Sequence, residues 1–511
     1  MKPFHKYSKG FNLKQIVTDI FFLCIIFSAW LLINLTSLQV EFCLLCFAVV
    51  GALLSTYCKR IFLAIVFGGK LMTGSKISYC GGSVPVLWEG DVVVCGGGAA
   101  GVAAAVSAAR AGRKVALLEK SICAGGMLTN GLLPSIIHMT DGVNMLSGGI
   151  CKEIVDAVSE KMVVKPLYNW HNIHPEPMKR VLDDILLGAG VDVLYNMHVF
   201  DVISHAGQLE AVLASGVAGK QAIRGKIFID ATGDGHIAML ADAPWEMGDA
   251  DGHTMAPTLC TLFERVDFEQ RPPDYRYAGS GRKEWREDTE KGVAPLPEHH
   301  FVGFFRNGAT SGSGNLGHMY GTNPLDPISV SKACIEGRQQ SEIYLDFYRS
   351  RVSGFQQATL AATASQLGVR ESRRIIGEYV MTHDDYICRR RFPDDIGCFA
   401  YPIDIHAAGA NASEQQNVEL RLAQSRFKDG EHYGIPYRAL LPKETKNLLV
   451  AGRCISCDRA MQSSIRVVPG CMITGQAAGN AAALAVEHQV DLRQVDIKQL
   501  QQWQRNQGIW L

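Results

Sequence analysis

Three glycines, spaced as Gly96-x-Gly98-x-x-Gly101, are the residues whose type and spacing point most directly to chemistry. In the pattern G-x-G-x-x-G, the first glycine permits a tight turn and the second lets the main chain approach a pyrophosphate. The third allows a helix to pack closely on a strand. The diphosphate then lies at the helix N-terminus, where free amides and the positive end of the helix dipole meet it. Glu119 lies 23 residues after Gly96, where an acid can accept hydrogen bonds from ribose hydroxyls. Together these residues predict dinucleotide binding.

The elements needed to position these glycines are present on both sides of them. Residues 91–95, DVVVC, form a short β-branched run typical of a buried parallel strand. The Ala-rich run after Gly101 favours a helix that ends at Gly112. A second strand is predicted at residues 114–118, directly before Glu119. This order predicts a Rossmann-like α/β domain.

Segments that follow the glycine turn favour FAD over a nicotinamide cofactor. Residues 121–131, SICAGGMLTNG, place a Gly-Gly pair where a loop could run along a ribityl chain and pyrophosphate. Residues 190–210 alternate like a small meander, and main chain near His198 and Val199 could meet an adenine. The apolar segment 226–235, KIFIDATGDG, ends in a turn that could return to the cofactor.

A second group of elements near the C-terminus would close over the cofactor. Residues 447–452, NLLVAG, are predicted as a strand, and a helix rich in small residues is predicted from about Gly475 to Val486. The N-terminus of that helix could face the pyrimidine edge of a flavin, where negative charge develops on reduction. A simple dehydrogenase needs no such late return, so the sequence favours a flavin.

Over roughly residues 85–490, the chain resembles the FAD-dependent oxidoreductase family with a glutathione-reductase-type fold, distantly akin to the fumarate reductase and aspartate oxidase flavoproteins. The resemblance is carried by VVVCGGGAAGVAAAVSAARAG, IDATGDGHIAMLAD, LGVRESRRIIGEY and NLLVAGRCISCDRAMQSSIRVVPGCMITGQAAGNAAALA. It implies non-covalent FAD. The residues predicted to bind FAD are Gly96, Gly98, Ala99, Ala100, Gly101, Glu119, Lys120, Gly125, Gly126, Met127, Val199, Ala231, Thr232, Gly233, Asp234, Gly452, Arg453, Asp458, Gly475, Gln476 and Ala477.

The predicted fold is α/β, with a Rossmann-like FAD-binding domain and an inserted α+β substrate or cap domain. We place the FAD-binding domain at residues 85–240 and 442–490, the cap domain at 241–441 and a C-terminal tail helix at 491–511. The elements expected within the cap are a strand at 254–266, a loop at 267–300 and a helix at 329–351. The active site is expected where the cap meets the flavin-binding domain.

The candidates for catalysis are Arg370, Arg466 and His253. Flavin chemistry needs a held substrate, a general acid or base, and cations for an anionic substrate. On a helix, Arg370 and Arg374 would share a face at i, i+4, with Glu371 off it. Alternatively, this run ties the cap to the flavin-binding domain through ion pairs. Arg466 precedes the late helix, and His253 opens the predicted strand and could donate a proton.

Other reactive side chains receive a structural interpretation. Cys454 and Cys457 form a C-x-x-C without a second pair, which favours incidental thiols over a metal or redox role. His299 and His300 have no further ligand at metal spacing, so no metal site is predicted. His138, after the glycine-rich loop, is a minor candidate for a proton donor.

The N-terminal region is apolar. Residues 20–38 and 42–58 are uncharged runs of about 19 and 17 residues, near the length that crosses a bilayer. Positive charges flank the pair, which fits a helical hairpin with both ends in the cytoplasm. Residues 1–71 are therefore a membrane hairpin or, if translation starts at Met72, a dispensable extension. The catalytic part faces the cytoplasm at a membrane in the first case and is cytoplasmic in the second.

The charge balance bears on the partners. Lys+Arg and Asp+Glu number 50 each, which gives no electrostatic argument for nucleic acid. We expect a hydride transfer between FAD and a small organic substrate, with an electron acceptor or donor that the sequence does not identify. One alternative is a membrane-linked flavin reductase or dehydrogenase that exchanges electrons with quinone. Another is an FAD-binding structural or RNA-modification partner protein.

Overall fold

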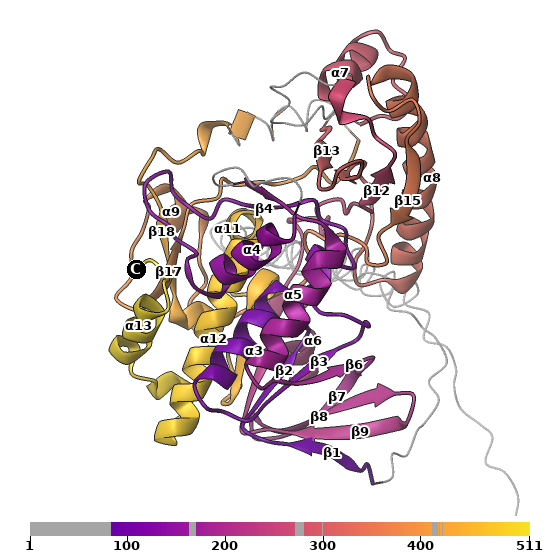
Figure 1. Cartoon of the computed structure of the whole chain (residues 1–511). Coiled ribbons are helices and arrows are strands. Elements are labelled where there is room, and N and C mark those ends of the chain that lie inside the picture. Colours follow the sequence, from indigo (N-terminus) through magenta and orange to yellow (C-terminus); the bar gives the residue numbers. More distant parts are fainter. Residues whose placement is uncertain are drawn as a thin grey trace, which may run out of the picture. The chain divides into compact units, whose positions relative to one another are not determined.

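A five-stranded parallel sheet carries the glycine turn at the carboxyl end of its central strand (Figure 1). All four neighbouring strand pairs are parallel. The central strand, with the sequence VVVC, is buried along its whole length, as its β-branched composition predicts. In spatial order the strands are β19 (Leu448–Val450), β10 (Ile227–Asp230), β2 (Val92–Cys95), β3 (Val115–Glu119) and β6 (Asp192–Tyr195).

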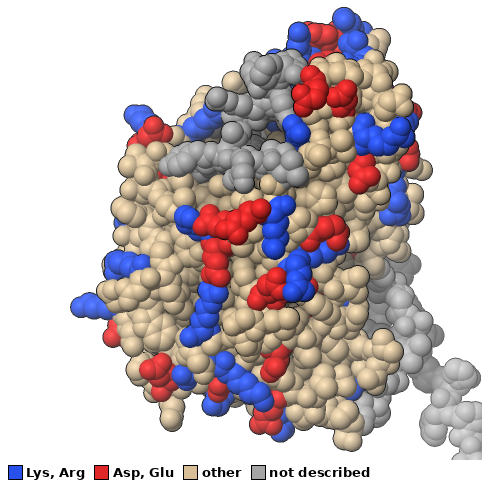
Figure 2. Space-filling model, viewed as in Figure 1, with Lys and Arg blue, Asp and Glu red and all other residues tan. Residues whose placement is uncertain are grey.

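The computed structural model describes residues 83–162, 170–270, 281–298, 300–410, 417, 420–421 and 423–511. The membrane hairpin predicted for residues 20–58 lies outside them. Across the described ranges, no helix combines the length and the apolar character that a membrane crossing requires. Residues 83–511 form one compact unit. On the face shown in Figure 2, Lys and Arg side chains are interspersed with Asp and Glu.

Two helices on the sheet lie so close together that only glycine fits between them. They are α3 (Ala99–Arg110), which follows β2, and α12 (Val468–His488). A Cβ at Gly475 would lie 2.1 Å from the carbonyl oxygen of Ala100, and one at Gly479 would lie 2.0 Å from Oγ of Ser107. Because later residues of α12 meet later residues of α3, the helices run parallel. Next to them lie α4 (Gly149–Glu160) and α5 (Pro175–Gly188).

The predicted start of the late helix near Gly475 is wrong. The helix begins at Val468, seven residues earlier. Pro469 lies in its first turn, where proline is tolerated because its missing N–H would have no helical partner. Gly475 therefore lies inside the helix.

The meander predicted after the first βαβ unit forms a separate sheet in the order β1-β9-β8-β7. Its strands β7, β8 and β9 are joined antiparallel by short turns, and β1 adds to β9 in parallel. The strands are β1 (Val86–Glu89), β7 (His198–His205), β8 (Gln208–Gly216) and β9 (Gly219–Arg224).

Residues from the middle of the chain form a second layer, which contains an antiparallel sheet in the order β13-β14-β12-β15 (Figure 1). Phe263, Phe304 and Tyr348 pack in its aromatic core. Its elements are β12 (Thr261–Glu264), α7 (Arg282–Glu290), β13 (Gly303–Arg306), β14 (Gly312–Asn315), α8 (Pro327–Arg351) and β15 (Thr359–Thr363).

Two sequence predictions in this layer are corrected. The loop predicted at residues 267–300 contains α7, whose charged sequence has one large apolar residue, Trp285, stacked on Phe301. A single apolar anchor leaves no helical period to detect. The strand predicted at residues 254–266 is limited to residues 261–264.

The remaining elements connect these layers. The run around Arg370 is not helical: residues 370–373 are irregular, and Arg374 begins a strand. These elements are β4 (Ser135–Ile137), β5 (Trp170–Asn172), α6 (His236–Leu240), β11 (Trp245–Glu246), β16 (Arg374–Ile375), α9 (His383–Ile387), β17 (Asp395–Phe399), β18 (Tyr433–Pro436), α11 (Arg459–Ile465) and α13 (Ile497–Asn506).

Candidate functional site

The three glycines of the turn after β2 have different reasons to be glycine. Gly96 has a φ of +98°, and a Cβ there would lie 2.6 Å from the carbonyl oxygen of Ala231. A Cβ at Gly101 would lie 1.7 Å from the carbonyl oxygen of Gly96. At Gly98 a Cβ would meet nothing within 4 Å among the described residues. Gly96 and Gly101 are therefore required by the fold, whereas the open space at Gly98 can be filled by a ligand.

The first turn of α3 offers main-chain donors beside that space. Gly98 is the N-cap, and no side chain in the described ranges caps the helix. Its first intrahelical bond runs from the amide of Val102 to the carbonyl of Gly98, so the amides of Ala99, Ala100 and Gly101 have no helical partner. This arrangement suits a diphosphate.

A second loop lies against the glycine turn. The amide of Gly125 donates to the carbonyl of Gly97 at 2.7 Å, and Gly98 and Gly125 form a parallel bridge. Gly126 has a φ of +52°, and a Cβ there would lie 3.2 Å from Cα of Gly98. Met127 follows in a short 3₁₀ turn. The Gly-Gly pair thus borders the space beside Gly98.

Glu119 is buried at the end of β3 and holds two loops by their main chain. Its Oε2 accepts from the amide of Gly97 at 2.6 Å, and its Oε1 accepts from the amide of Ser121 at 2.8 Å. A carboxylate oxygen can accept a second bond, so the position predicted for a ribose contact keeps that capacity.

The predicted adenine region gains a residue that the sequence analysis missed. The carbonyl oxygen of Val199 lies 3.1 Å from Nε2 of His236, and the rings of His198 and His236 are 6.0 Å apart. Burial, then His236, then the charge of Lys120 lower the pKa of His198. His236 directly follows the segment ATGDG, and this position was the available signal.

The turns after β10 and β19 are tied together by an ion pair. Arg453 donates from Nη2 to Oδ1 of Asp234, which also accepts from Oγ of Ser372 at 2.8 Å. Burial raises the pKa of Asp234, but the Arg453 charge and the Ser372 hydrogen bond outweigh it, and the net shift is downward. In the same turns, Gly233 has a φ of +75° and Gly452 a φ of +83°, and Thr232 donates to Asp230.

Four residues predicted to bind the cofactor contact other parts of the protein, and none of them offers a free amide at a helix N-terminus. Both carboxylate oxygens of Asp458 accept main-chain amides, from Met461 at the start of α11 and from His383. Gly475, Gln476 and Ala477 are buried in the interior of α12 against its neighbours. The residues at the N-terminus of α12 are Val467 and Val468.

The starts of α3 and α12 point the same way. Ala100 is the second residue of α3, whereas its neighbour Gly475 is the eighth residue of α12. The start of α12 therefore projects six residues, or roughly 9 Å, beyond the start of α3. This offset places a diphosphate site and a second helix end in line, as an extended dinucleotide needs. The open cradle at Gly98 and this offset fit FAD.

Two of the predicted catalytic residues, Arg370 and Arg466, interact through their charges. Arg370 is buried, and its Nη1 donates to the carbonyl of Ala256 at 2.6 Å and to Oγ1 of Thr258 at 2.9 Å. Burial, followed by the like charge of Arg466, lowers the pKa of Arg370 to about 10. Arg466 donates from Nη2 to the carbonyl and to Oδ2 of Asp404, at 3.0 and 3.2 Å. Its buried Nε has no hydrogen-bond partner within the described part of the chain. The pair can hold an anion.

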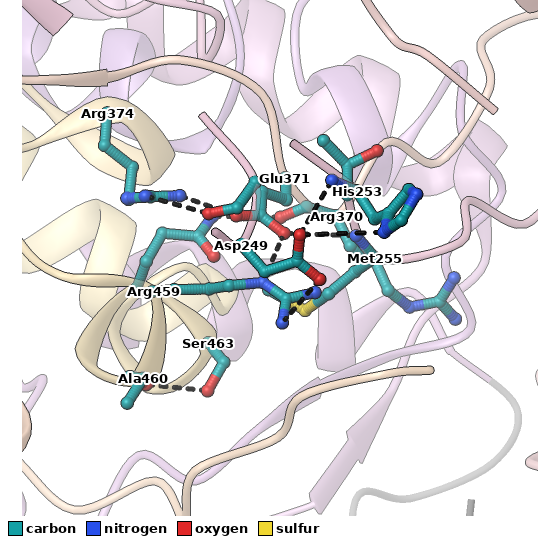
Figure 3. Close-up of polar contacts among 12 residues, drawn as sticks. Asp249, His253, Met255, Arg370, Glu371, Arg374, Arg459, Ala460 and Ser463 are labelled. Atoms are coloured by element: carbon teal, nitrogen blue, oxygen red, sulfur yellow. Dashed lines mark hydrogen bonds and ion pairs between the residues drawn. The ribbon is translucent and has the colours of Figure 1, made fainter. Parts of the chain in front are cut away.

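Glu371 and Arg374, which follow Arg370 in the sequence, form ion pairs that hold the fold together. Glu371 is fully buried, and Arg374 and Arg459 both approach its carboxylate, at 2.6 and 3.1 Å (Figure 3). The interpretation of this run as an ion-pair tie is the one that these contacts favour. The third candidate, His253, has a side chain that is 66% exposed and lies 3.7 Å from Asp249.

A buried row of polar side chains, which the sequence analysis missed, runs from the second layer to Arg466. We call Glu298, His318, His406 and Asp404 the polar row. Oε2 of Glu298 lies 2.7 Å from Nδ1 of His318, and Nε2 of His318 lies 2.8 Å from Nδ1 of His406. Nε2 of His406 lies 3.4 Å from Oδ1 of Asp404. The alternation in the segment YPIDIH, which puts Asp404 and His406 on one face, was the only sequence signal.

Other candidate residues lie around this region. The ring of His138 meets Tyr401 edge to face at 5.1 Å, and Tyr401 donates to Oδ2 of Asp404 at 3.3 Å. Cys454 and Cys457 are free thiols, and burial raises the pKa of both, which makes them poor nucleophiles.

Comparison with known proteins identifies a family. A family model described as FAD dependent oxidoreductase matches residues 91–503. Similar solved structures include a geranylgeranyl bacteriochlorophyll reductase-like protein from Thermoplasma acidophilum, at 14% identity over 83% of this chain and 84% of that one, with a TM-score of 0.41. Another is p-nitrophenol 4-monooxygenase from Pseudomonas putida, at 12% identity over 83% and 85%, with a TM-score of 0.43. No curated protein matches the chain.

Proposed function

The chain belongs to the FAD-dependent oxidoreductase family and is an FAD-dependent enzyme, and from this premise we propose its reaction and its site. We propose that it transfers a hydride between non-covalently bound FAD and a small organic anion held by Arg370 and Arg466. The observation that carries the proposal is the unpartnered, buried Nε of Arg466, whose charge also lowers the pKa of the buried Arg370. A buried donor without a partner favours a ligand that accepts a hydrogen bond from it, and an ionised acceptor makes the stronger bond.

The residues proposed to hold FAD are those around the open space at Gly98. The amides at the start of α3 hold the diphosphate, the Gly125–Gly126 loop lines it, and Glu119 accepts from a ribose. FAD supplies the two-electron chemistry, and the protein supplies binding, orientation and charge.

The finer relationship is also a proposal. A glutathione-reductase-type arrangement is supported by the βαβ unit, the meander β7–β9 and the late return of β19 and α12 to the first sheet. In the same way, we propose that residues 241–441 act as the substrate domain, because Arg370 comes from this segment and Arg466 from the late return.

The test is anaerobic reduction of the purified yellow protein by a panel of small organic anions, such as 2-hydroxy acids, followed as bleaching of the flavin absorbance. Arg466→Met should slow bleaching by at least about 100-fold, because a charge-assisted hydrogen bond contributes about 1.5–3 kcal/mol and the variant loses two or more. The matched control is Arg438→Met, which removes an arginine paired with Asp394 at 2.9 Å and should leave bleaching unchanged. A protein that binds no FAD, or equal bleaching in both variants, would refute the proposal.

A further inference from the structure

We propose that Glu298, His318, His406 and Asp404 form a proton relay that takes up one proton when an anion binds to Arg370 and Arg466. The inference rests on the proposed function, since it needs an anionic substrate at this pair. It adds a proton-transfer role for four residues and a linkage between substrate binding and protonation.

The polar row has one more contact than it has protons. Two neutral imidazoles carry two N–H groups, but the row has three nitrogen-to-neighbour contacts, at 2.7, 2.8 and 3.4 Å. The two short contacts take the two protons. Nε2 of His406 is then a bare lone pair that faces Oδ1 of Asp404, and this contact is the long one. A third proton would fill it.

The two imidazoles can pass that proton along the row. When both change tautomer together, the vacant position moves from the Asp404 end to the Glu298 end, because each ring releases a proton from one nitrogen as it gains one on the other. A proton that enters beside Arg466 is therefore shared by all four residues.

Burial determines where the proton enters. The side chains of Glu298 and His318 are 3% exposed and that of His406 is 5% exposed, whereas Asp404 is 16% exposed. Asp404 is also the member that contacts Arg466. The accessible end of the row is thus the end at the arginine pair.

Charge counting gives the linkage to an anion. With neutral histidines, two arginine charges balance the carboxylates of Glu298 and Asp404, so the group is neutral. A bound monoanion leaves one uncompensated negative charge in a buried region, which is costly. One proton on the row restores neutrality. Reciprocally, the proton strengthens the binding of the anion.

The groups that face the row from its surroundings are consistent with this resting state. They are Arg370, Arg466, His300, Tyr320, Tyr344 and Tyr401. Burial, and then the charge of Arg370, hold the pKa of His406 well below its ordinary value of 6.5, even though Asp404 opposes them. An anion on Arg370 would reduce that electrostatic effect and raise the pKa.

The stored proton is suited to the proposed reaction. When a hydride adds to a double bond of the substrate, the neighbouring atom needs one proton, which the filled row can supply. The hydride carries both electrons, so the row handles only the proton.

The experiment uses the FAD-loaded protein and acetate, a monoanion that stays ionised from about pH 6 to about pH 8. Acetate binding is followed by the change in flavin absorbance. The dissociation constant should rise about tenfold for each pH unit within the linked range, because one proton accompanies each anion. Calorimetry in buffers of different ionisation enthalpy should give one proton taken up per acetate.

The variants separate the relay from a structural role. His406→Asn keeps a donor toward His318 but removes the proton site at Nε2, so binding should become independent of pH and take up no proton. His432→Asn is the matched control: it removes an imidazole that lies 2.8 Å from Asp141, outside the row, and should keep the wild-type slope.

The outcomes distinguish a failure of the relay from a failure of the anion site. Acetate binding without proton uptake in the wild type overturns the relay and leaves the proposed function standing, even if His406→Asn does not fold. A failure of acetate to bind, or equal binding to Arg466→Met, overturns the anion site and the relay with it. Proton uptake that persists in His406→Asn also overturns the relay.

Discussion

The cradle at Gly98 and the polar row beside Arg466 are built in opposite ways. The cradle is the space at Gly98 that is bordered by the free amides of Ala99, Ala100 and Gly101 and by the Gly125–Gly126 loop. It is formed by main chain and by the absence of side chains. The glycine turn and its amides come from one βαβ unit. The row and the arginine pair consist of side chains from segments more than 160 residues apart along the chain, from Glu298 to Arg466. A substitution that adds side-chain atoms should therefore disrupt the cradle. A substitution that removes a charged or protonatable side chain should disrupt the region of the polar row and the arginine pair.

The largest effect is expected where a buried charge loses its partner. Glu371→Ala leaves Arg374 and Arg459 without the carboxylate that both approach, and we expect a loss of about 3–5 kcal/mol in unfolding free energy. Urea unfolding measures it. The control, Glu210→Ala, breaks an exposed pair with Arg224 and should change stability little. A small loss in Glu371→Ala would mean that charge pairing does not hold this region together.

The cradle should fail through overpacking. A methyl group at Gly101 would lie 1.7 Å from the carbonyl oxygen of Gly96, so Gly101→Ala should cost about 1–3 kcal/mol in stability as well as FAD binding. Gly188→Ala, where a Cβ meets nothing among the described residues, serves as the control. Thermal unfolding of the FAD-free proteins checks the difference.

Gly98→Val tests whether Gly98, unlike Gly101, is needed for FAD binding and not for the fold. Because the space at Gly98 is open, the FAD-free protein should keep its stability, while FAD binding weakens by roughly 10- to 100-fold through lost main-chain bonds to the diphosphate. Fluorescence titration with FAD measures the affinity. If Gly98→Val binds FAD as tightly as the unmodified protein, the cradle has been assigned to the wrong place.

The smallest effect concerns pH. The lowered pKa values of His318 and His406 mean that the unfolded chain binds protons first as the pH falls. Stability should therefore be highest above the ordinary histidine pKa of 6.5 and decline as the pH falls below it. His406→Asn should flatten the decline in melting temperature between about pH 7.5 and about pH 5.5, whereas Gly98→Val should not change it. An unchanged slope in His406→Asn would argue against a neutral buried His406.

The sequence alone determined the first βαβ unit, the glycine turn and the FAD-dependent class of enzyme, because these depend on neighbours along the chain. A turn that requires positive φ, a buried β-branched strand and an Ala-rich helix each leave a local pattern. The start of α12 was misplaced because only the run of small residues from Gly475 onward was interpreted as helix, whereas the mostly larger, buried residues 468–474 belong to the same helix.

Only the tertiary structure decided which charged residues meet. Arg370 and Glu371 are adjacent, yet the charge of Arg466 acts on Arg370, whereas Glu371 pairs with Arg374 and Arg459. The irregular chain at residues 370–373 turns the two side chains in different directions, and a helical period gave the wrong geometry. His318 carries no pattern of its own, and the alternation in YPIDIH does not show which residue His406 meets. Their hydrogen bond exists because folding brings two distant segments together in a buried place where each must find a polar partner.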